Sequence, residues 1–442
     1  MGLKYIEPVK SIILLLLVLL SITFTFSIWT YSPRLDTIEQ SPTVDISIGE
    51  RRKVQDIIKP YKILIKYEES LNGTTDQIRI DSIMREMNSW KVTQLVPGQN
   101  EMNKGQMKAF FEDTNQFTLY FQGDVPLPVY EEILPFEDNI RLPEFSFDRL
   151  VVKWNPKEVA FEVHFINRAT GTHFHGKVTP KDTMTSYRNI VIEGENLPSY
   201  TEVNVQESVY LAVPTEPVTM NQIVYYQEEI SPTRFRDALF NDPNAVRRSQ
   251  VDGKREEFGD DHALLVVNTE SKMLNFAHPA VENREEVKPS TLLTDVIDSI
   301  NEHGGWTDSF RFSYINHYSH YVRFQLFIQG YPVLEPAGIT EIAQYYGVNR
   351  VFKYIRPYYT LDVGVDEEEV SLPSGAAIAN ELMESEKIDF GTVEEITTGY
   401  MMRHNLEKRI FVMEPAWFYY IKGRWFSYTA EDQGGGEQIG LE

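Results

Sequence analysis

The sequence predicts an α+β protein, in which one N-terminal transmembrane helix is followed by a multi-domain extracellular region of mixed, mostly antiparallel sheets with packed helices. Three observations support this class. Residues 11–31 form an uncharged, apolar run near the amino terminus. Strand-like stretches, several joined across turn sequences, predominate after residue 145 and alternate with a few amphipathic helices. The chain of 442 residues also exceeds the length of one ordinary domain.

Residues 11–31 have the length and composition of a transmembrane helix. At about 1.5 Å per residue, the run covers roughly the 30 Å of a bilayer's hydrocarbon core. Lys4 and Lys10 precede it, and the first cation after it is Arg34. This bias places residues 1–10 in the cytoplasm and the C-terminal bulk outside the cell, as expected of a single-pass protein of the cell membrane. The alternative is a cleaved signal peptide, whose apolar region would be shorter and would end in small residues.

Five hydroxyl side chains lie in the outer half of this predicted helix. With about 100° per residue, Thr23, Ser27 and Thr30 fall on one stripe. Ser21 and Thr25 fall almost opposite. Small hydroxyl residues let helices approach closely and hydrogen-bond across the contact, for about 0.6–2 kcal/mol each, so the two stripes are candidate partner-binding surfaces. Alternatively, each hydroxyl bonds back to a carbonyl of its own helix.

The composition excludes several classes of function. The formal net charge of −23 makes the chain a poor binder of nucleic acid, which is a polyanion, and keeps it off anionic lipid surfaces. The absence of cysteine removes disulfides, thiol nucleophiles and cysteine metal sites. With 42% hydrophobic residues the chain can still build real cores, so we expect its stability to come from core size.

After a polar linker at residues 32–44, we expect a membrane-proximal α/β domain over residues 45–205, with a division near residue 140 left open. Apolar side chains at i, i+3, i+4 and i+7 make residues 76–88 an amphipathic helix. A second helix is expected at residues 101–113. The predicted strands cover residues 61–67, 90–96, 117–121, 150–154, 159–166 and 173–178.

Two further domains are expected, a middle helix-plus-meander domain at residues 206–335 and a similar C-terminal domain at residues 336–430, before a disordered tail at residues 431–442. One predicted helix begins at residue 231, and two others cover residues 290–303 and 374–386. The predicted strands cover residues 209–213, 264–267, 273–276, 310–315, 321–328, 348–355, 400–404, 410–413 and 417–421.

Two segments of these domains resemble each other. Residues 324–332 and 417–425 each comprise an aromatic strand, a polar residue, a glycine turn and another aromatic residue. This similarity indicates a divergent duplication, although two unrelated hairpins with common turn chemistry would also explain it. The acidic run at residues 366–369 is expected to be a solvated loop.

No catalytic pattern stands out. The chain lacks a glycine-rich phosphate loop, a G-x-S-x-G elbow and an H-E-x-x-H helix, so we expect neither an enzyme nor a cofactor. The best metal candidates are His173 and His175, because residues i and i+2 of a strand face the same way. His164, on the predicted partner strand, is a candidate third ligand. We favour the alternative that these histidines ligate nothing.

Several blocks of the chain resemble the YycH family. They are residues 9–14, 28–33, 235–243, 330–333 and 414–417. The resemblance extends over nearly the whole chain and implies an accessory membrane protein of the WalK/WalR (YycG/YycF) two-component system, which governs cell-wall metabolism in Gram-positive bacteria. It further implies a complex with the sensor kinase WalK (YycG) and with YycI, a smaller single-span relative, in which transmembrane helices carry much of the contact. No catalytic residues carry over from the family.

The leading hypothesis is a membrane-anchored, non-enzymatic regulator whose helix biases the conformation of the kinase's helices. Such a bias requires unequal contact with the states of the kinase. One alternative is a surface-anchored metal-binding or hydrolytic module that uses His164, His173 and His175. Another is an extracellular receptor that passes a ligand signal inward. The sequence decides neither the sign of regulation nor the signal sensed, and a homo-dimer is left open.

Overall fold

The computed structural model describes residues 14–25, 47–155, 160–205, 209–282, 285–335, 337–405, 407–428 and 438–439. It consists of two compact units, Met1–Asp45 and Ile46–Glu442, each described by itself. In the first unit, residues 14–25 are helical. Within the part of the chain that the structure describes, no helix is long and apolar enough to cross a membrane. The rest of the predicted span, the flanking residues 1–10 and 32–44, and most of the predicted tail lie outside the described residues.

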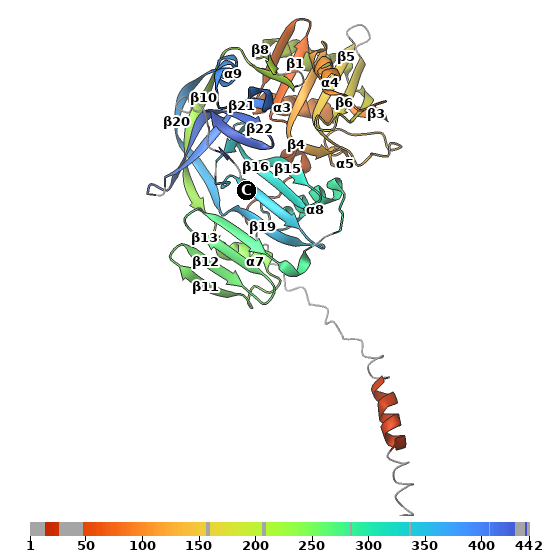
Figure 1. The fold of residues 1–442 in the computed structure, drawn as a ribbon, viewed down its shortest axis with the longest axis vertical. Helices are drawn as coiled ribbons and strands as arrows, with labels where there is room; N and C mark the ends of the chain where they lie inside the picture. The colour runs from red at the N-terminus through yellow and green to blue at the C-terminus, as the bar shows by residue number, and fades with distance from the viewer. Residues whose placement is uncertain are drawn as a thin grey trace, which may run out of the picture. The chain divides into compact units, whose positions relative to one another are not determined.

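An antiparallel sheet of seven strands begins the second unit (Figure 1). Its strand order is β2-β1-β4-β5-β6-β7-β3. Its strands are β1 (Lys62–Tyr67), β2 (Ser70–Thr74), β3 (Lys91–Pro97), β4 (Gln116–Pro126), β5 (Ser146–Asn155), β6 (Ala160–Ile166) and β7 (His173–Thr179). Successive side chains of a strand point to opposite faces of the sheet. Ile63 and Ile65 of β1 join the main core on one face, so Lys62 and Leu64 face the other way.

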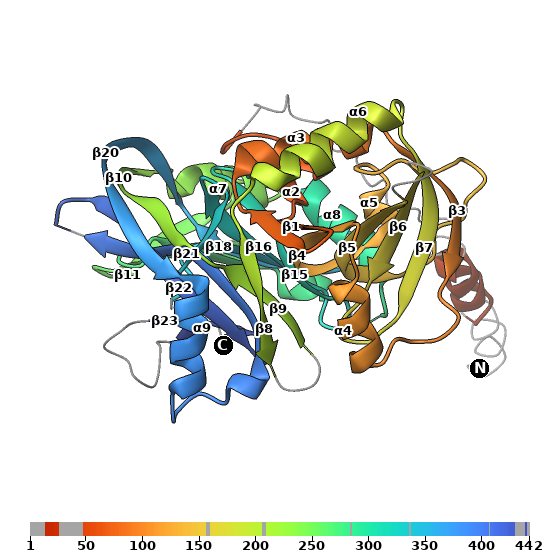
Figure 2. The ribbon, with the colours of Figure 1, turned by 90° about the horizontal axis from the view of Figure 1, so that it is seen from above.

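Helices cover both faces of this sheet (Figure 2). On the face of Ile63 lies α3 (Gln77–Asn88), whose four inward residues are buried as the periodicity predicts. Asp76 caps it, because its carboxylate accepts the backbone N–H groups of residues 78 and 79. The opposite face carries α4 (Lys104–Glu112), whose Met107 and Phe111 pack against β5 and β6. The shorter helices are α2 (Val54–Ile57), α5 (Leu127–Tyr130), α6 (Thr183–Tyr187) and η1 (Arg188–Ile192).

A larger sheet of fifteen strands follows the short hairpin of β8 (Tyr200–Val205) and β9 (Val209–Pro214). Its strands are β10 (Pro217–Glu229), β11 (Arg247–Asp252), β12 (Arg255–Gly259), β13 (Leu264–Asn268), β14 (Met273–Ala277), β15 (Phe310–Asn316), β16 (Tyr321–Ile328), β17 (Tyr331–Leu334), β18 (Glu341–Tyr346), β19 (Val351–Pro357), β20 (Tyr359–Ser374), β21 (Val393–Asn405), β22 (Ile410–Ile421), β23 (Arg424–Tyr428) and β24 (Gln438–Ile439). The helices are α7 (Pro232–Leu239), α8 (Pro289–Glu302) and α9 (Gly375–Glu384).

The sheet consists of two arms, one running from β11 to β17 in the strand order and the other from β21 to β20. A parallel pair between β17 and β21 joins the arms, whereas the other strand pairs of the described sheets are antiparallel. This pattern confirms the predicted class of mixed, mostly antiparallel sheets with packed helices. β10 pairs with both β20 and β22, so strands from either side of the expected boundary between residues 335 and 336 share one sheet.

The two similar segments form hairpins of the same shape. α8 is followed by β15, β16 and β17, and α9 by β21, β22 and β23. The turn residues Gln329 and Gly330 have φ angles of 50° and 89°, and Lys422 and Gly423 have 48° and 86°. Two positive φ angles define the tight turn that matches the twist of antiparallel strands. The repeated order and turn agree with a duplication, which itself stays a prediction.

The prediction of a solvated loop at residues 366–369 is wrong. These residues lie in β20, where Glu367, Glu368 and Glu369 are register partners of β10. β20 is the last strand of the sheet and pairs on one side with β10. Charged side chains are typical of such edge strands, because they discourage pairing with other chains.

Candidate functional site at the junction of the two sheets

Charged side chains gather where the seven-stranded sheet meets the larger one. Lys62, Tyr120 and Arg149 are direct neighbours across β1, β4 and β5. Glu395 of β21 reaches this row, and its Oε1 lies 2.6 Å from Lys62 Nζ while its Oε2 lies 3.4 Å from Arg149 Nη2. Tyr61 donates a hydrogen bond to the same Oε2 at 2.8 Å. One carboxylate of the C-terminal sheet thus binds three side chains of the N-terminal half.

Asp148 extends this group of charges. Its Oδ2 accepts hydrogen bonds from Arg168 Nε at 2.6 Å and from Arg149 Nη1 at 3.1 Å. We refer to the whole group as the junction cluster, which consists of Tyr61, Lys62, Asp148, Arg149, Arg168 and Glu395. Burial raises the pKa of Glu395, but the charges of Lys62 and Arg149 outweigh burial and hold that pKa below its ordinary value. Glu395 is therefore ionised at neutral pH and ties β21 to the N-terminal sheet.

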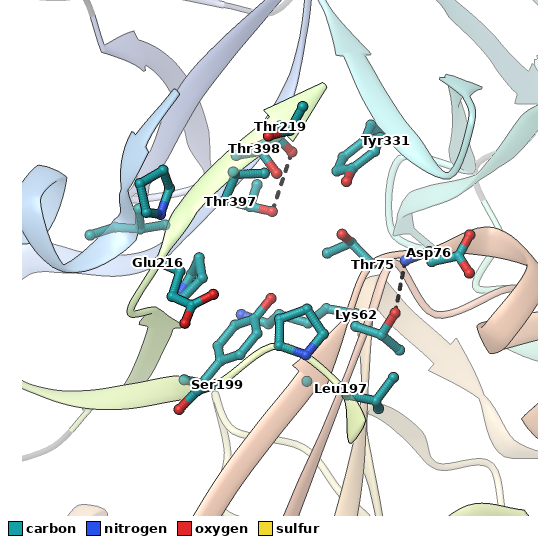
Figure 3. A pocket seen from close by; sticks show the side chains of 18 of the residues that line it. Lys62, Thr75, Asp76, Leu197, Ser199, Glu216, Thr219, Tyr331, Thr397 and Thr398 are labelled. Atoms are coloured by element: carbon teal, nitrogen blue, oxygen red, sulfur yellow. Dashed lines mark hydrogen bonds between the residues drawn. The ribbon is translucent and has the colours of Figure 1, made fainter. Parts of the chain in front are cut away.

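A cavity of about 470 Å³ lies beside the junction cluster, and Lys62 belongs to both (Figure 3). We refer to it as the junction cavity. Its walls come from the start of α3, from residues 197–200, and from β10, β17 and β21. These segments are distant in sequence and meet only because the two sheets pack together. The residues used below are Gly73, Thr74, Thr75, Asp76, Arg79, Ser199, Tyr200, Glu216, Thr219, Tyr331, Thr397, Thr398 and Trp417.

Strands β6 and β7 bring two of the predicted histidines together. His164 lies directly opposite His175, and their ring centroids are 5.6 Å apart. The ring of His173 lies instead against the backbone of Gly98. Among the described residues, no three histidine, aspartate or glutamate side chains are placed to hold a metal ion. The pairing of the two strands is confirmed, and the described geometry offers no support for a metal-binding module.

The side chain of His164 is largely buried, with 11% of it exposed. Its ring contacts Phe110, with 5.1 Å between ring centroids. Burial and the neighbouring His175 lower the pKa of His164 to about 3. The imidazole is therefore neutral at neutral pH, so the 3.7 Å approach of its Nε2 to Glu162 Oε2 is not an ion pair there.

Mild acid is expected to destabilise the protein through His164. The unfolded side chain binds a proton below about pH 6.5, whereas the folded one stays neutral down to about pH 3, so stability present above pH 6.5 is lost as the pH falls. Between about pH 7 and pH 5 this loss amounts to about 2 kcal/mol. Urea unfolding at both pH values should show that His164→Gln loses about 2 kcal/mol less than the wild type. His262→Gln, at an exposed histidine, is the matched control, and equal losses in wild type and His164→Gln would contradict the account.

Three of the five helix hydroxyls predicted to bind partners lie within the described helix. Thr23 Oγ1 donates to Leu19 O at 2.7 Å, and Thr25 Oγ1 donates to Ser21 O at 2.9 Å. These are the back-bonds of the alternative explanation, although each hydroxyl oxygen keeps its capacity to accept a hydrogen bond. Two members of the set lie outside the described residues: Ser27 and Thr30.

Sequence reasoning missed the junction cluster. Lys62 and Glu395 are separated by 333 positions, and nothing in the local pattern pairs them. A weak signal exists, because Lys62 and Arg149 each begin an apolar strand run on a face that is otherwise buried. Charged residues are almost never fully buried unless they are paired, so a lone cation in such a run indicates an unseen partner.

Comparison with known proteins gives the class of the fold. The solved structure described as YycH from Bacillus subtilis is similar with a TM-score of 0.72 at 18% identity, and the match covers 87% of this chain and 99% of that one. The two share one α+β architecture. The model described as "YycH protein, N-terminal domain" matches residues 7–191, and "YycH protein, C-terminal domain" matches residues 206–433. The chain belongs to the YycH family, which confirms the resemblance.

A curated relative extends this comparison to a named role. The "Two-component system WalR/WalK regulatory protein YycH" of Bacillus subtilis (strain 168) is 21% identical over 439 residues. The match covers 95% of this chain and 95% of the relative. The two proteins therefore correspond over almost their entire lengths.

Proposed function

We propose that this chain is a membrane-anchored, non-enzymatic regulator of the WalR/WalK two-component system, and that it acts on the sensor kinase WalK. The observation that carries the proposal is the match over 95% of both chains to a relative named for regulation of that system. Membership of the YycH family supports the same role. The proposed location is the cell membrane, with the second compact unit outside the cell.

The proposed contact with WalK and with YycI is the helix of residues 11–31. Its described part exposes large apolar side chains at positions 14–20, as a surface that packs against lipid or other helices requires. A helix shifts the kinase only if it binds one kinase state more tightly than another, and about 1.4 kcal/mol corresponds to a tenfold shift. Two hydroxyl contacts of about 0.6–2 kcal/mol each are of the size that this requires.

The first described residues of the second unit are held by the segment that follows α8. The backbone N–H of Ile48 donates to His303 O at 3.0 Å, and that of Glu50 donates to Trp306 O at 3.0 Å. Residues 48–50 are thus held by backbone hydrogen bonds to the residues that follow α8.

Co-purification from membranes tests the proposal. The full chain is compared with a version in which residues 11–31 are replaced by an unrelated apolar anchor of equal length. We expect WalK and YycI to accompany the native helix and to fall about tenfold or more with the replaced one. Ser21→Ala with Thr25→Ala, and Thr23→Ala with Ser27→Ala, should each weaken capture of one partner.

The other outcomes are equally informative. Equal capture by both anchors would overturn the helix mechanism and place the contact in the second unit. Capture by neither anchor would overturn the partnership with WalK itself. An association between two copies of this chain stays a prediction, which two differently tagged copies in the same membranes would test.

A further inference from the structure

We propose that the junction cavity binds an uncharged, polyhydroxylated ligand, a saccharide of one or two rings. This inference goes beyond the proposed function and does not depend on the membrane helix. A volume of about 470 Å³ falls in the range of small-molecule pockets, about 300–1,000 Å³. The residues of the cavity come from both sheets, so an occupant would contact both at once.

Hydroxyl groups dominate the polar part of the lining. Eight of the lining residues carry one: Thr74, Thr75, Ser199, Tyr200, Thr219, Tyr331, Thr397 and Thr398. Figure 3 shows Thr397 and Thr398 on one wall and Tyr331 with Thr75 on the other, with open space between them. Each hydroxyl can both donate and accept a hydrogen bond, as the hydroxyls of a sugar do.

Two of these hydroxyls each make one hydrogen bond within the protein, which leaves both with capacity for a ligand. Thr74 Oγ1 accepts from the backbone N–H of Asp76 at 3.0 Å, and Thr397 Oγ1 donates at 3.4 Å to the carbonyl of the next residue. The second of these bonds is long and therefore weak. A sugar hydroxyl at this wall could replace it without leaving a buried group unsatisfied.

The charged residues of the lining are already committed to partners within the protein. Lys62 is paired with Glu395 at 2.6 Å. Arg79 Nη1 lies 2.9 Å from Glu193 Oε2, and its Nη2 donates to a backbone carbonyl. The carboxylate of Asp76 caps α3. An ion entering the cavity would lose its hydration without gaining a free counter-charge from these residues, which favours a neutral ligand.

Glu216 is the exception among the charged residues of the lining, and its carboxylate is the reason to test charged sugars as well as neutral ones. Its side chain is exposed at the rim of the cavity. A cationic sugar could use this carboxylate, whereas an anionic sugar would be repelled. Comparing neutral, cationic and anionic forms of one ring therefore separates recognition by hydroxyls from attraction by charge.

Three aromatic rings contribute to the apolar part of the lining, beside aliphatic side chains and prolines. Tyr200 packs closely over β2, because a Cβ at Gly73 would lie 2.9 Å from Tyr200 Cε2. Tyr331 contacts Tyr400 edge-on, with 6.1 Å between ring centroids. Trp417 donates its Nε1–H to Pro373 O at 3.0 Å, which fixes the indole. Rings held in this way offer apolar surface to the C–H groups of a sugar.

Calorimetric titration of the full chain in detergent tests the proposal. The neutral probes are glucose, N-acetylglucosamine, maltose and chitobiose. The charged probes are glucuronate and glucosamine, at about pH 6.5, where the amine is largely protonated. We expect at least one neutral sugar to bind and to outcompete both charged forms.

Three variants link any binding to the cavity. The double substitution Tyr200→Phe with Tyr331→Phe should weaken binding about tenfold, since each lost hydroxyl contact contributes part of that factor. Thr219→Val, at an exposed position on the rim, should weaken binding without a change in thermal unfolding. Thr179→Val, at an exposed position on β7 away from the cavity, is the matched control and should bind as the wild type does.

Several results would overturn the proposal. The first is the absence of binding by every neutral sugar, and the second is a preference for a charged form. The third is wild-type affinity both in the double variant Tyr200→Phe with Tyr331→Phe and in the single variant Thr219→Val. None of them bears on capture of WalK by the native helix. Conversely, equal capture of WalK by both anchors, or capture by neither, would leave sugar binding to the second unit intact, so the two proposals fail separately.

Discussion

Replacing Glu395 with glutamine is expected to lower the free energy of unfolding by about 3–5 kcal/mol. The side chain is 6% exposed and holds Lys62 and Arg149, so the variant leaves two buried cations without their shared carboxylate. Removing one partner of a buried ion pair lowers the free energy of unfolding by more than the intact pair contributes to it, because the remaining charge stays desolvated. The loss should be greatest above the folded-state pKa of Glu395, where the wild-type carboxylate is ionised.

Urea unfolding of the full chain in detergent, followed by tryptophan fluorescence, measures this effect. Glu394→Gln, one residue earlier on β21, is the matched control, and we expect a change within about 0.5 kcal/mol. The double substitution Lys62→Met with Glu395→Met should recover much of the loss, since apolar replacement of a buried pair is often neutral. A loss below about 1 kcal/mol for Glu395→Gln would show that the junction cluster does not hold the sheets together.

Replacing Trp306 with alanine is expected to cost about 3–5 kcal/mol and to release the entry segment of the second unit. The indole is 1% exposed, packs edge-on against Phe324 with 5.0 Å between ring centroids, and donates its Nε1–H to Asn301 Oδ1 at 2.9 Å. Its backbone pairs with Glu50. Truncation leaves a cavity beneath this pairing, and the backbone bonds that hold residues 47–50 lose their support.

Two measurements separate the global effect from the local one. Urea unfolding gives the loss of stability, and limited trypsin digestion reports release of the entry segment through cleavage after Arg51 or Arg52. Trp425→Ala, at a half-buried tryptophan of β23 that contacts Tyr420, is the control and should cost clearly less. Unchanged cleavage at a matched fraction of folded protein would contradict the supporting role of Trp306.

The sequence by itself determined the local elements, because their signals lie within one turn or one strand. The spacing of apolar residues in α3 predicts both the helix and the residues it buries. Pairing of β6 with β7, and the two glycine hairpins, follow from alternation and turn chemistry. The family resemblance also rests on short blocks of sequence, which can be recognised without knowledge of the tertiary structure.

Only the tertiary structure decided how these elements combine. The acidic run in β20 looks like a loop because charge opposes burial, yet an edge strand tolerates charge on its open side. The β17–β21 pair unites the two arms, and no local pattern in the sequence predicts that these two segments pair. Strand pairing over such separations depends on global packing, which local periodicity does not record.

The junction cluster and the junction cavity belong to this second category. Only a weak signal marks Lys62 and Arg149 along the chain, and none pairs them with Glu395, because their shared contact arises where two sheets meet. Most of the hydroxyls that line the cavity belong to ordinary strands, and they come together only where β2, β8, β10, β17 and β21 converge. Local sequence determines which face of a strand is polar, and the packing of distant strands determines whether that face meets water, an ion pair or a ligand.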